Sequence, residues 1–200
     1  MNNTLYPAPL YTFLSLCQRE ALPKEVLDCG AGGANPPLNL FCSYGYRAAG
    51  VEIDPQRAQL AREAARQHGV AVDIREVDMR RLPFAEQSFS FVYSYNSVFH
   101  LSKADIATAI AEMRRVLRRG GELLFAEHGT ARSVRAQRWQ HRIEPVWTPL
   151  AGGCHLTRDP PRILREAGFT VEWTEGLLDP RPLAARTIGP LTYGYWGVAR

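Results

Sequence analysis

The sequence lacks the features that mark membrane proteins, secreted proteins and proteins stabilised by disulfides or bound metal. No apolar run comes near the roughly 18 residues that cross a membrane, and Pro7 and Pro9 interrupt the N-terminal apolar stretch, which no basic segment precedes. We therefore expect neither a membrane span nor a signal peptide. The four cysteines form no Cys-x-x-Cys pair, so we expect no disulfide framework, no bound metal and a cytoplasmic location.

A large excess of one charge is also missing. The 24 basic residues outnumber the 20 acidic ones by four, a surplus too small to predict nucleic-acid binding. Lys24 and Lys103 are the only lysines, which we attribute first to genome composition and second to a demand for planar, bidentate donors. With 200 residues, 46% of them hydrophobic, the chain is expected to form one globular domain.

What is present is an alternation of helix-like and strand-like segments. Leu10, Phe13, Leu14 and Cys17 share one face of a predicted helix. Alternating elements with short connections predict parallel β-α-β units in an α/β fold. Strands are expected at residues 25–28, 48–53, 70–77, 89–93, 122–126, 169–173 and 192–198, and a late helix at 159–167.

Capping residues mark several helix boundaries. Asn35 followed by two prolines predicts a side-chain cap and a helix start. The segment Ser102-Lys-Ala-Asp105 is a capping box. We expect the pair Gly120-Gly121 to end the helix that this box begins.

A glycine cluster follows the first predicted strand. Asp28 ends that strand, and Gly30-Ala-Gly-Gly33 comes next, so a ligand could lie against bare backbone and exposed N–H groups. Glu52 ends the second strand at a spacing suited to a carboxylate that accepts hydrogen bonds from a ribose. Taken alone, the glycine cluster also fits an ordinary tight turn, and Glu52 also fits a solvated glutamate. Asn35 stands at the sixth position of the G-x-G-x-x-G pattern, which disfavours an NAD site.

The segment Asp28-x-Gly30-x-Gly32 resembles the D-x-G-x-G signature of class I S-adenosylmethionine (SAM) methyltransferases. Ala34, Ser90 and Arg119 depart from the family pattern, which usually has Gly, Asp and Pro there. The resemblance is close over residues 24–129. Further segments that match in order are Gly50–Pro55, Asp78-Met79 with Leu82–Phe84, Ser94–Leu101, and Met113–Arg118 with Gly120–Leu124.

Within this family the chain is most similar to the branch of ubiquinone-type, menaquinone-type and other small-molecule methyltransferases. Its C-terminal part, at Gly153–Arg158 and Tyr193–Tyr195, also resembles animal thiol methyltransferases. The resemblance implies a Rossmann-like, doubly wound, three-layer α/β/α fold. Its mostly parallel sheet would have seven strands, with the last one antiparallel.

The resemblance also implies that SAM is the cofactor and that a set of residues holds it without a metal. Glu52 would take the ribose, Ile53 would pack on the adenine, and Asp78 with Met79 would bind the adenine edge. The remaining cofactor residues would be Asp28, Gly30, Ala31 and Gly32 at the methionine end, and Ser94 and Tyr95 beside the sulfonium.

A general base helps methyl transfer only when the nucleophile arrives protonated, as a thiol or phenol would. His128 follows the fifth predicted strand and is the first candidate. His100, His155 and Tyr95 are the others. Each of these histidines also fits a purely structural role.

Residues 130–158 are predicted to form a substrate cap. Arg132, Arg135, Arg138 and Arg142 recur at helical spacing near Trp139 and Trp147. Such a stripe is commonly a solvated face. Alternatively its arginines recognise an anionic acceptor or an RNA backbone. The residues predicted to contact substrate are Trp139, Trp147, His155, Arg135 and Arg142.

We predict a single class I methyltransferase domain that acts as a monomer or homodimer on a small-molecule acceptor. It would comprise an N-terminal helix (1–23), a SAM-binding core (24–129), the cap (130–158) and a C-terminal helix with the last two strands (159–200). The alternatives are an RNA methyltransferase, which the mild charge argues against, and a catalytically silent SAM-binding partner subunit.

Overall fold

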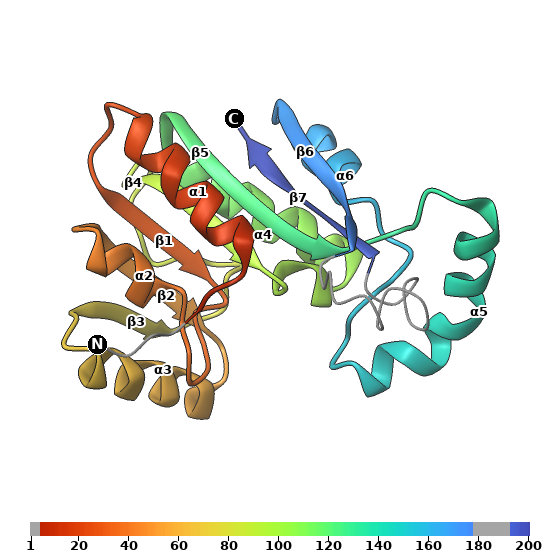
Figure 1. The fold of residues 1–200 in the computed structure, drawn as a ribbon, viewed down its shortest axis with the longest axis horizontal. Coiled ribbons are helices and arrows are strands. Elements are labelled where there is room, and N and C mark those ends of the chain that lie inside the picture. The colour runs from red at the N-terminus through yellow and green to blue at the C-terminus, as the bar shows by residue number, and fades with distance from the viewer. Residues whose placement is uncertain (1–4, 178–192) are drawn as a thin grey trace.

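The computed structural model describes residues 5–177 and 193–200, which form a seven-stranded sheet covered by helices (Figure 1). The strand order is β3-β2-β1-β4-β5-β7-β6. Strand β7 is antiparallel to both of its neighbours, and the other pairs are parallel. The strands are β1 (Glu25–Cys29), β2 (Arg47–Glu52), β3 (Val72–Glu76), β4 (Phe89–Tyr95), β5 (Leu117–His128), β6 (Val171–Leu177) and β7 (Tyr193–Ala199). This confirms the predicted fold.

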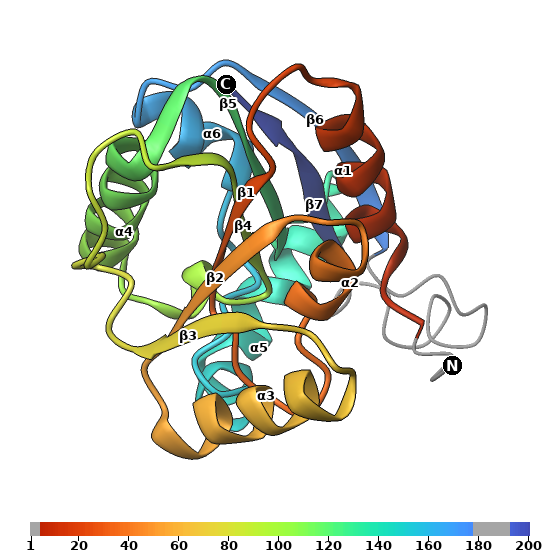
Figure 2. The same cartoon turned by 90° about the vertical axis from the view of Figure 1, so that its left-hand side faces the viewer.

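Helices pack on both faces of the sheet, which makes three layers (Figure 2). Helices α1, α2 and α3 contribute to the core on one face, and α4 and α6 to the core on the other. The helices are α1 (Ala8–Arg19), α2 (Leu38–Ser43), α3 (Pro55–Gln67), α4 (Lys103–Val116), α5 (Val134–Leu150) and α6 (Pro160–Glu166), with a short 3-10 helix η1 (Val98–His100).

Because the central strands are covered on both faces, their residues are apolar almost throughout. Successive side chains of a strand point to opposite faces. Val26 and Phe91 thus join the core beneath α1 and α2, whereas Leu27 and Val92 join the core beneath α4. The apolar stripe predicted for α1 is buried as expected.

Side chains cap four of the helices. Ser102 accepts a hydrogen bond from the backbone N–H of Asp105 and begins α4, as its capping box predicts. Asp54, Ser133 and Asp159 cap α3, α5 and α6 in the same way. These caps fix where the chain turns from each strand or loop into the following helix.

Two predicted boundaries are wrong. Helix α2 begins at Leu38 without a side-chain cap, and Asn35 is exposed; the two prolines extend the turn instead of opening the helix. Helix α4 ends at Val116, and β5 runs through both glycines. A Cβ on Gly121 would lie 2.5 Å from the backbone oxygen of Ser90, so this glycine allows β4 and β5 to approach where their register shifts. The predicted last strand started at Thr192, which lies outside the described residues.

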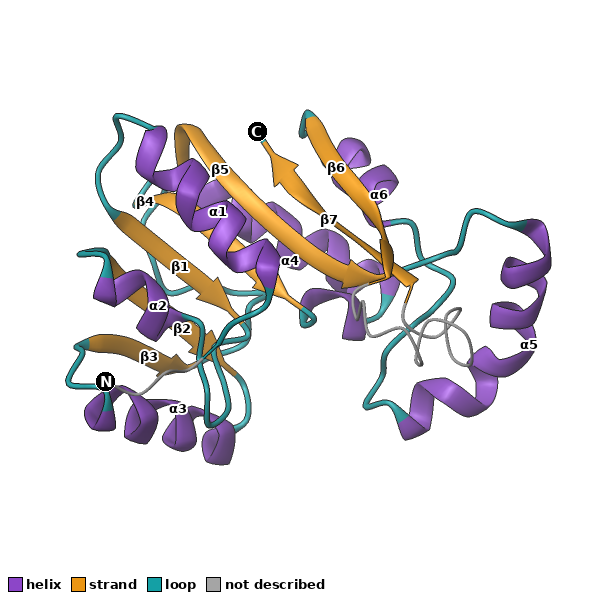
Figure 3. Ribbon diagram, in the orientation of Figure 1, coloured by secondary structure: helices purple, strands orange, loops and turns teal. Residues whose placement is uncertain are grey.

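Strands β1, β2, β4 and β5 run parallel and end at the same edge of the sheet. The strand order reverses between β1 and β4, and open α/β sheets bind ligands in the crevice at such a point. Helix α5 stands away from the sheet, joined to β5 and α6 by loops (Figure 3). Among the described residues, no helix is long and apolar enough to cross a membrane, and no cluster of His, Cys, Asp and Glu is placed to hold a metal ion.

Candidate functional site

A cavity of about 380 Å³ lies at this edge, within the usual size range of small-molecule sites, roughly 300–1,000 Å³. Loops from several strands meet there. The residues that line it are Gly30, Val51, Glu52, Ile53, Arg57, Val77, Asp78, Met79, Asn96, Ser97, His100, Leu101 and Gly152. The predicted cofactor residues Gly30, Glu52, Ile53, Asp78 and Met79 are therefore brought together, whereas Asp28, Ala31, Gly32, Ser94 and Tyr95 do not line it.

The turn after β1 needs glycine at two positions for steric reasons. Gly30 has φ +113°, and a Cβ there would lie 2.1 Å from the Ser97 hydroxyl oxygen. A Cβ on Gly32 would lie 2.0 Å from Oε2 of Glu52. The N–H groups of Gly30 and Ala31 donate to the Val51 oxygen at 2.9 and 3.0 Å. These two N–H groups therefore fasten the turn to β2 and are not exposed, contrary to the expectation from sequence.

Asp28 is buried beneath this turn. Its burial raises its pKa to about 8; the nearby Tyr93 hydroxyl lowers the pKa, and the charge of Glu52 raises it. Within the described residues, Oδ2 of Asp28 has no hydrogen-bond partner. The Asp28 carboxyl is therefore largely protonated at neutral pH.

Glu52 holds a carboxylate at the cavity wall. Its Oε1 accepts the Asp54 N–H at 3.0 Å, and its Oε2 lies 3.5 Å from Nε of Arg57. The carboxylate is nearly buried, yet its Oε2 faces the side of Gly32 where no side chain stands. It can accept further hydrogen bonds from a ligand in the cavity.

The loops after β2 and β3 contribute an apolar side chain, Ile53, and a charged carboxylate, Asp78, to the cavity wall. Ile53 is 67% exposed, an unusual position for a large aliphatic side chain at a cavity wall. Both oxygens of Asp78 accept hydrogen bonds from Arg80, and Arg80 also donates to Asp105 at 2.8 Å. The hydrogen bonds from Arg80 lower the pKa of Asp78, so this carboxyl is charged.

The end of β4 contributes residues that the sequence analysis did not single out. Ser94 is buried and donates to Oε1 of Glu127 at 3.0 Å, and Tyr95 packs against the core beneath α1. Asn96 and Ser97 line the cavity instead. Asn96 has φ +48°, and its buried Oδ1 has no partner among the described residues. An asparagine just beyond a strand was the available signal, because Asn tolerates this backbone region better than most residues.

Glu127 is a second residue that sequence reasoning missed. Its buried carboxyl also accepts the Ser97 N–H at 3.0 Å, so it ties the end of β5 to the loop after β4. Burial raises its pKa to about 8, while the N–H of Ser97 and the hydroxyl of Ser94 lower it. Glu127 therefore positions the cavity-lining loop.

The structure separates the three candidate histidines. His128 ends β5 and His100 ends η1, which follows β4, so both lie at the same edge of the sheet. Burial lowers the pKa of His128, and the charge of His100 lowers it further. Nδ1 of His100 lies 3.1 Å from the Gly152 oxygen, and burial lowers the pKa of His100 as well. His155 instead pairs with Glu144 at 2.9 Å, and this contact holds the segment between α5 and α6 against α5.

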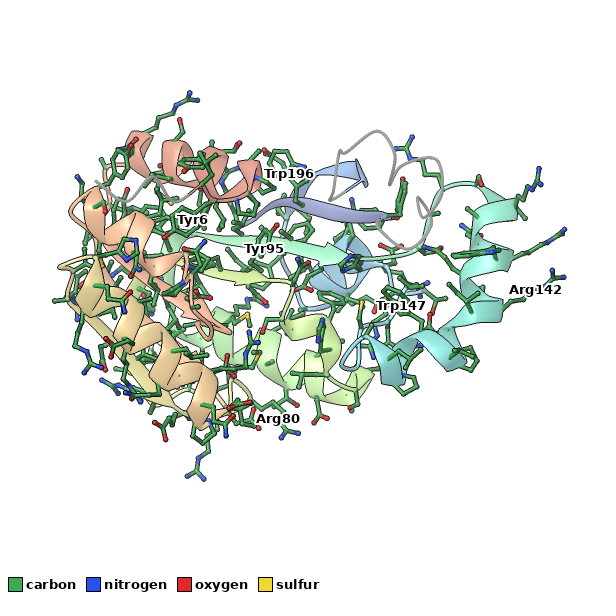
Figure 4. All side chains as sticks on the ribbon, turned by 60° about the horizontal axis from the view of Figure 1, so that its bottom comes forward. Tyr6, Arg80, Tyr95, Arg142, Trp147 and Trp196 are labelled. Atoms are coloured by element: carbon green, nitrogen blue, oxygen red, sulfur yellow. The ribbon has the colours of Figure 1, made fainter. Side chains whose placement is uncertain are left out.

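The predicted cap is anchored at its base. Gln140 is buried, accepts the Ala131 N–H at 2.8 Å and donates to the Gly129 oxygen at 3.1 Å. Trp147 is half-buried and points toward the sheet, whereas Arg142 points away from the molecule (Figure 4). Arg135 and Trp139 are exposed. None of the predicted substrate residues lines the 380 Å³ cavity.

Comparisons with known proteins identify the family. The family model described as a methyltransferase domain matches residues 27–125. An O-methyltransferase of Penicillium expansum is 30% identical over 74% of this chain and 52% of its own length. A thiol S-methyltransferase of Rattus norvegicus is 35% identical over 42% of this chain and 34% of its own. The chain thus spans about half or less of these curated relatives.

Solved structures share the fold over almost the whole chain. A SAM-dependent methyltransferase from Methanosarcina mazei superimposes with a TM-score of 0.71 at 22% identity, covering 98% of this chain and 97% of its own. A Burkholderia thailandensis 1,6-didemethyltoxoflavin N1-methyltransferase with bound S-adenosylhomocysteine gives a TM-score of 0.66 at 20% identity, covering 96% and 76%. These likenesses show the fold.

Proposed function

Because the chain belongs to the methyltransferase domain family, we propose that it is a class I SAM-dependent enzyme that binds SAM in the 380 Å³ cavity and methylates a small molecule. The observation that carries the proposal is the position of Glu52. Its carboxylate stands opposite a glycine turn, at the switch point where a nucleoside would lie.

The residues of the cavity fit the groups of SAM. Glu52 would accept the ribose hydroxyls. The exposed Ile53, with Met79, would cover the adenine, and Asp78 would accept from its amino group. Oδ1 of Asn96, which has no partner among the residues that the structure describes, offers an acceptor for the ammonium or a hydroxyl of the ligand, because buried acceptors are normally hydrogen-bonded.

The glycine turn would carry the methionine end of SAM. Gly30 and Gly32 leave it the room that a Cβ would fill, and Ala31 lies between them. Asp28 supports the turn from beneath, and Ser94 acts through Glu127 on the loop beside the sulfonium. Tyr95 completes the end of β4.

Methyl transfer asks mainly for alignment and for a pocket without water. SAM supplies a methyl group on a positively charged sulfur. For an acceptor that arrives as a thiol or phenol, His128 would take the proton, since its lowered pKa leaves it neutral at pH 7. His100 and Tyr95 are the other candidates for this role.

The acceptor would lie between this edge and the cap of residues 130–158. Trp147, which faces inward (Figure 4), would form an apolar wall, with Trp139 and the arginines Arg135 and Arg142 around it, and His155 would hold the cap closed through Glu144. The relatives named as O- and S-methyltransferases support a small-molecule acceptor with an oxygen or sulfur nucleophile.

Ligand-dependent melting and turnover test the proposal. SAM and S-adenosylhomocysteine should raise the melting temperature, since a ligand at 100 times its Kd adds about 2.7 kcal/mol to the free energy of unfolding, and NAD should not. Labelled SAM incubated with separate pools of thiols, phenols, quinols, amines and tRNA should transfer label to a small molecule. Stabilisation by NAD alone, or label in tRNA alone, would contradict the proposal.

A further inference from the structure

A second cavity, of about 720 Å³, lies between α4 and α6 on the face of the sheet opposite α1. Its lining residues include Ala107, Ala111 and Ile163 on the two helices, and Thr157, Arg158 and Asp159 in the segment that leads into α6; we call the part lined by this segment its inner end. We call this cavity the α4–α6 groove. Its inner end adjoins Lys103, which begins α4 just after the loop of His100 and Leu101.

Arg158 is anomalous among the arginines of this protein. It is only 5% exposed, yet its Nη1 has no hydrogen-bond partner in the described part of the chain. By contrast, Arg80 and Arg115, which are more exposed, each bond to carboxylates. Buried charges in proteins are normally paired because removing a charge from water is costly. Among the residues that the structure describes, Arg158 lacks such a pair.

Two carboxylates lie near Arg158 without pairing with it. The charges of Glu144 and Glu127 raise its pKa, while burial lowers it more strongly. Both oxygens of Glu144 are already engaged, by His155 and Thr157 on one and by the Leu156 N–H on the other. Glu127 accepts from Ser94 and Ser97. The carboxylates of Glu144 and Glu127 therefore already accept hydrogen bonds from loop residues.

The position of Arg158 is fixed by the backbone. Its carbonyl oxygen accepts the Thr130 N–H at 2.7 Å, which joins it to the end of β5 at the base of the cap. Its charge lowers the pKa of His100, a residue that lines the 380 Å³ cavity. Arg158 thus lines the α4–α6 groove, while its backbone adjoins the end of β5.

We propose that Arg158 is an anion-binding residue whose guanidinium receives the carboxylate, phosphate or sulfate group of a small molecule at the inner end of the α4–α6 groove. A planar guanidinium binds such groups through two parallel hydrogen bonds. The lack of a partner for Nη1 among the described residues is then explained, because the ligand would supply a counter-charge. This inference concerns anion binding and does not require methyl transfer.

The test compares Arg158→Met with a control, Arg66→Met, on the full chain. Arg66 is an exposed arginine of α3 that pairs with Glu63. Benzoate, inorganic phosphate and sulfate are titrated by calorimetry, with benzamide as the neutral counterpart of benzoate. We expect at least one anion to bind the wild type and the control with equal affinity, and to bind Arg158→Met at least about tenfold more weakly. The affinity for benzamide should be the same in all three proteins.

A structural role for Arg158 would give a different pattern. Because Nη1 of Arg158 has no hydrogen-bond partner within the described residues, Arg158→Met should melt no lower than the wild type, and Arg158→Lys should keep part of the anion affinity. Equal anion affinity in Arg158→Met and the wild type, no anion binding by the wild type, or a lowered melting temperature with unchanged anion binding would each overturn the proposal.

A further titration distinguishes an anion that belongs to the cofactor from one that belongs to another small molecule. S-Adenosylhomocysteine carries a carboxylate that 5′-methylthioadenosine lacks. If Arg158→Met weakens only the former, the anion belongs to the cofactor; if it weakens neither but abolishes benzoate binding, the anion belongs to another small molecule. Failure of SAM binding altogether would contradict the proposed function and leave the benzoate result intact.

Discussion

At the scale of single residues, the cavity wall depends on one carboxylate facing one glycine. Glu52 keeps one oxygen for the Asp54 N–H and has only an exposed arginine, Arg57, near the other among the described residues. The Arg57 side chain is 57% exposed and its Nε lies 3.5 Å from the carboxylate, so water screens this ion pair from the arginine side and it contributes little. The second oxygen can therefore exchange Arg57 for ligand hydroxyls with small loss.

Glu52→Ala should weaken SAM binding by about 1.5–3 kcal/mol, the usual contribution of hydrogen bonds to a charged group. Titration calorimetry measures this directly. Glu76→Ala, which removes an exposed carboxylate paired with Arg62, is the control and should leave the affinity unchanged. Equal affinity in Glu52→Ala and the wild type would place the ribose elsewhere.

Gly32→Ala should weaken SAM binding through the same carboxylate. The new Cβ would lie 2.0 Å from Oε2 of Glu52, so the carboxylate must move. In the Glu52→Ala background this clash is gone and the close contact with Cβ of Arg57, at 2.8 Å, remains, so adding Gly32→Ala should cost less. A double-mutant cycle measures the difference, and simple additivity would argue against the contact.

The histidine assignment predicts a pH profile. The pKa of His128 is lowered from its usual 6.5, by burial and then by the charge of His100, so a base at this position is active from below pH 6.5 upward. With a thiol or phenol acceptor, His128→Asn should lower kcat by about 10²- to 10⁴-fold and remove the acidic limb of the profile. His68→Asn, at the end of α3, should change neither; an unaltered acidic limb in His128→Asn would assign the base elsewhere.

At the scale of elements, α5 is attached to the sheet through its base. Of its residues, only Gln140 is buried, and the amide of that side chain bridges the backbone of Gly129 and Ala131. His155 and Glu144 close the other end of the cap. Most of its surface touches neither core, so its stability is expected to be lower than that of the sheet.

Gln140→Ala should therefore loosen the cap before it unfolds the molecule. Each buried backbone group left unpaired costs about 1–3 kcal/mol, and the loss falls on residues 130–158. Limited proteolysis should cut this segment faster while far-ultraviolet circular dichroism stays unchanged. The control Gln56→Ala, at an exposed position of α3, should behave as the wild type, and equal cleavage rates would show that Gln140 does not anchor the cap.

At the scale of the whole molecule, two buried carboxyls couple stability to pH. The pKa values of Asp28 and Glu127 are both raised to about 8, whereas unfolded carboxyls titrate at about 4. Between these values the folded state holds protons that the unfolded state has released. The free energy of unfolding should therefore decrease as the pH rises from about 5 to 8.

Each group contributes a slope of up to about 1.4 kcal/mol per pH unit. Urea unfolding at intervals between pH 5 and 8 measures it. Glu127→Gln keeps the acceptor for Ser94 and Ser97 but cannot ionise, so its slope should be shallower than that of the wild type. Glu86→Gln, an exposed site, serves as the control, and parallel curves for Glu127→Gln and wild type would contradict the raised pKa.

The sequence alone determined the parts of this protein that depend on local patterns. The alternation of apolar runs and amphipathic stripes fixes the order of strands and helices. The order of motifs from Asp28 to Leu124 indicates the family, with its antiparallel last strand. The positions of Gly30, Glu52 and Asp78 at the ends of successive parallel strands also follow, because parallel strands end at one edge.

Only the tertiary structure decided which side chains are paired, buried or left without a partner. Ser94 turns inward to Glu127 while Asn96 and Ser97 reach the cavity, because a positive φ at Asn96 redirects the chain. The partners of Glu127 lie 30 or more positions away, and the isolation of Arg158 among the described residues follows from burial among acids committed elsewhere. Burial and pairing depend on contacts between distant segments, which no local pattern of residues specifies.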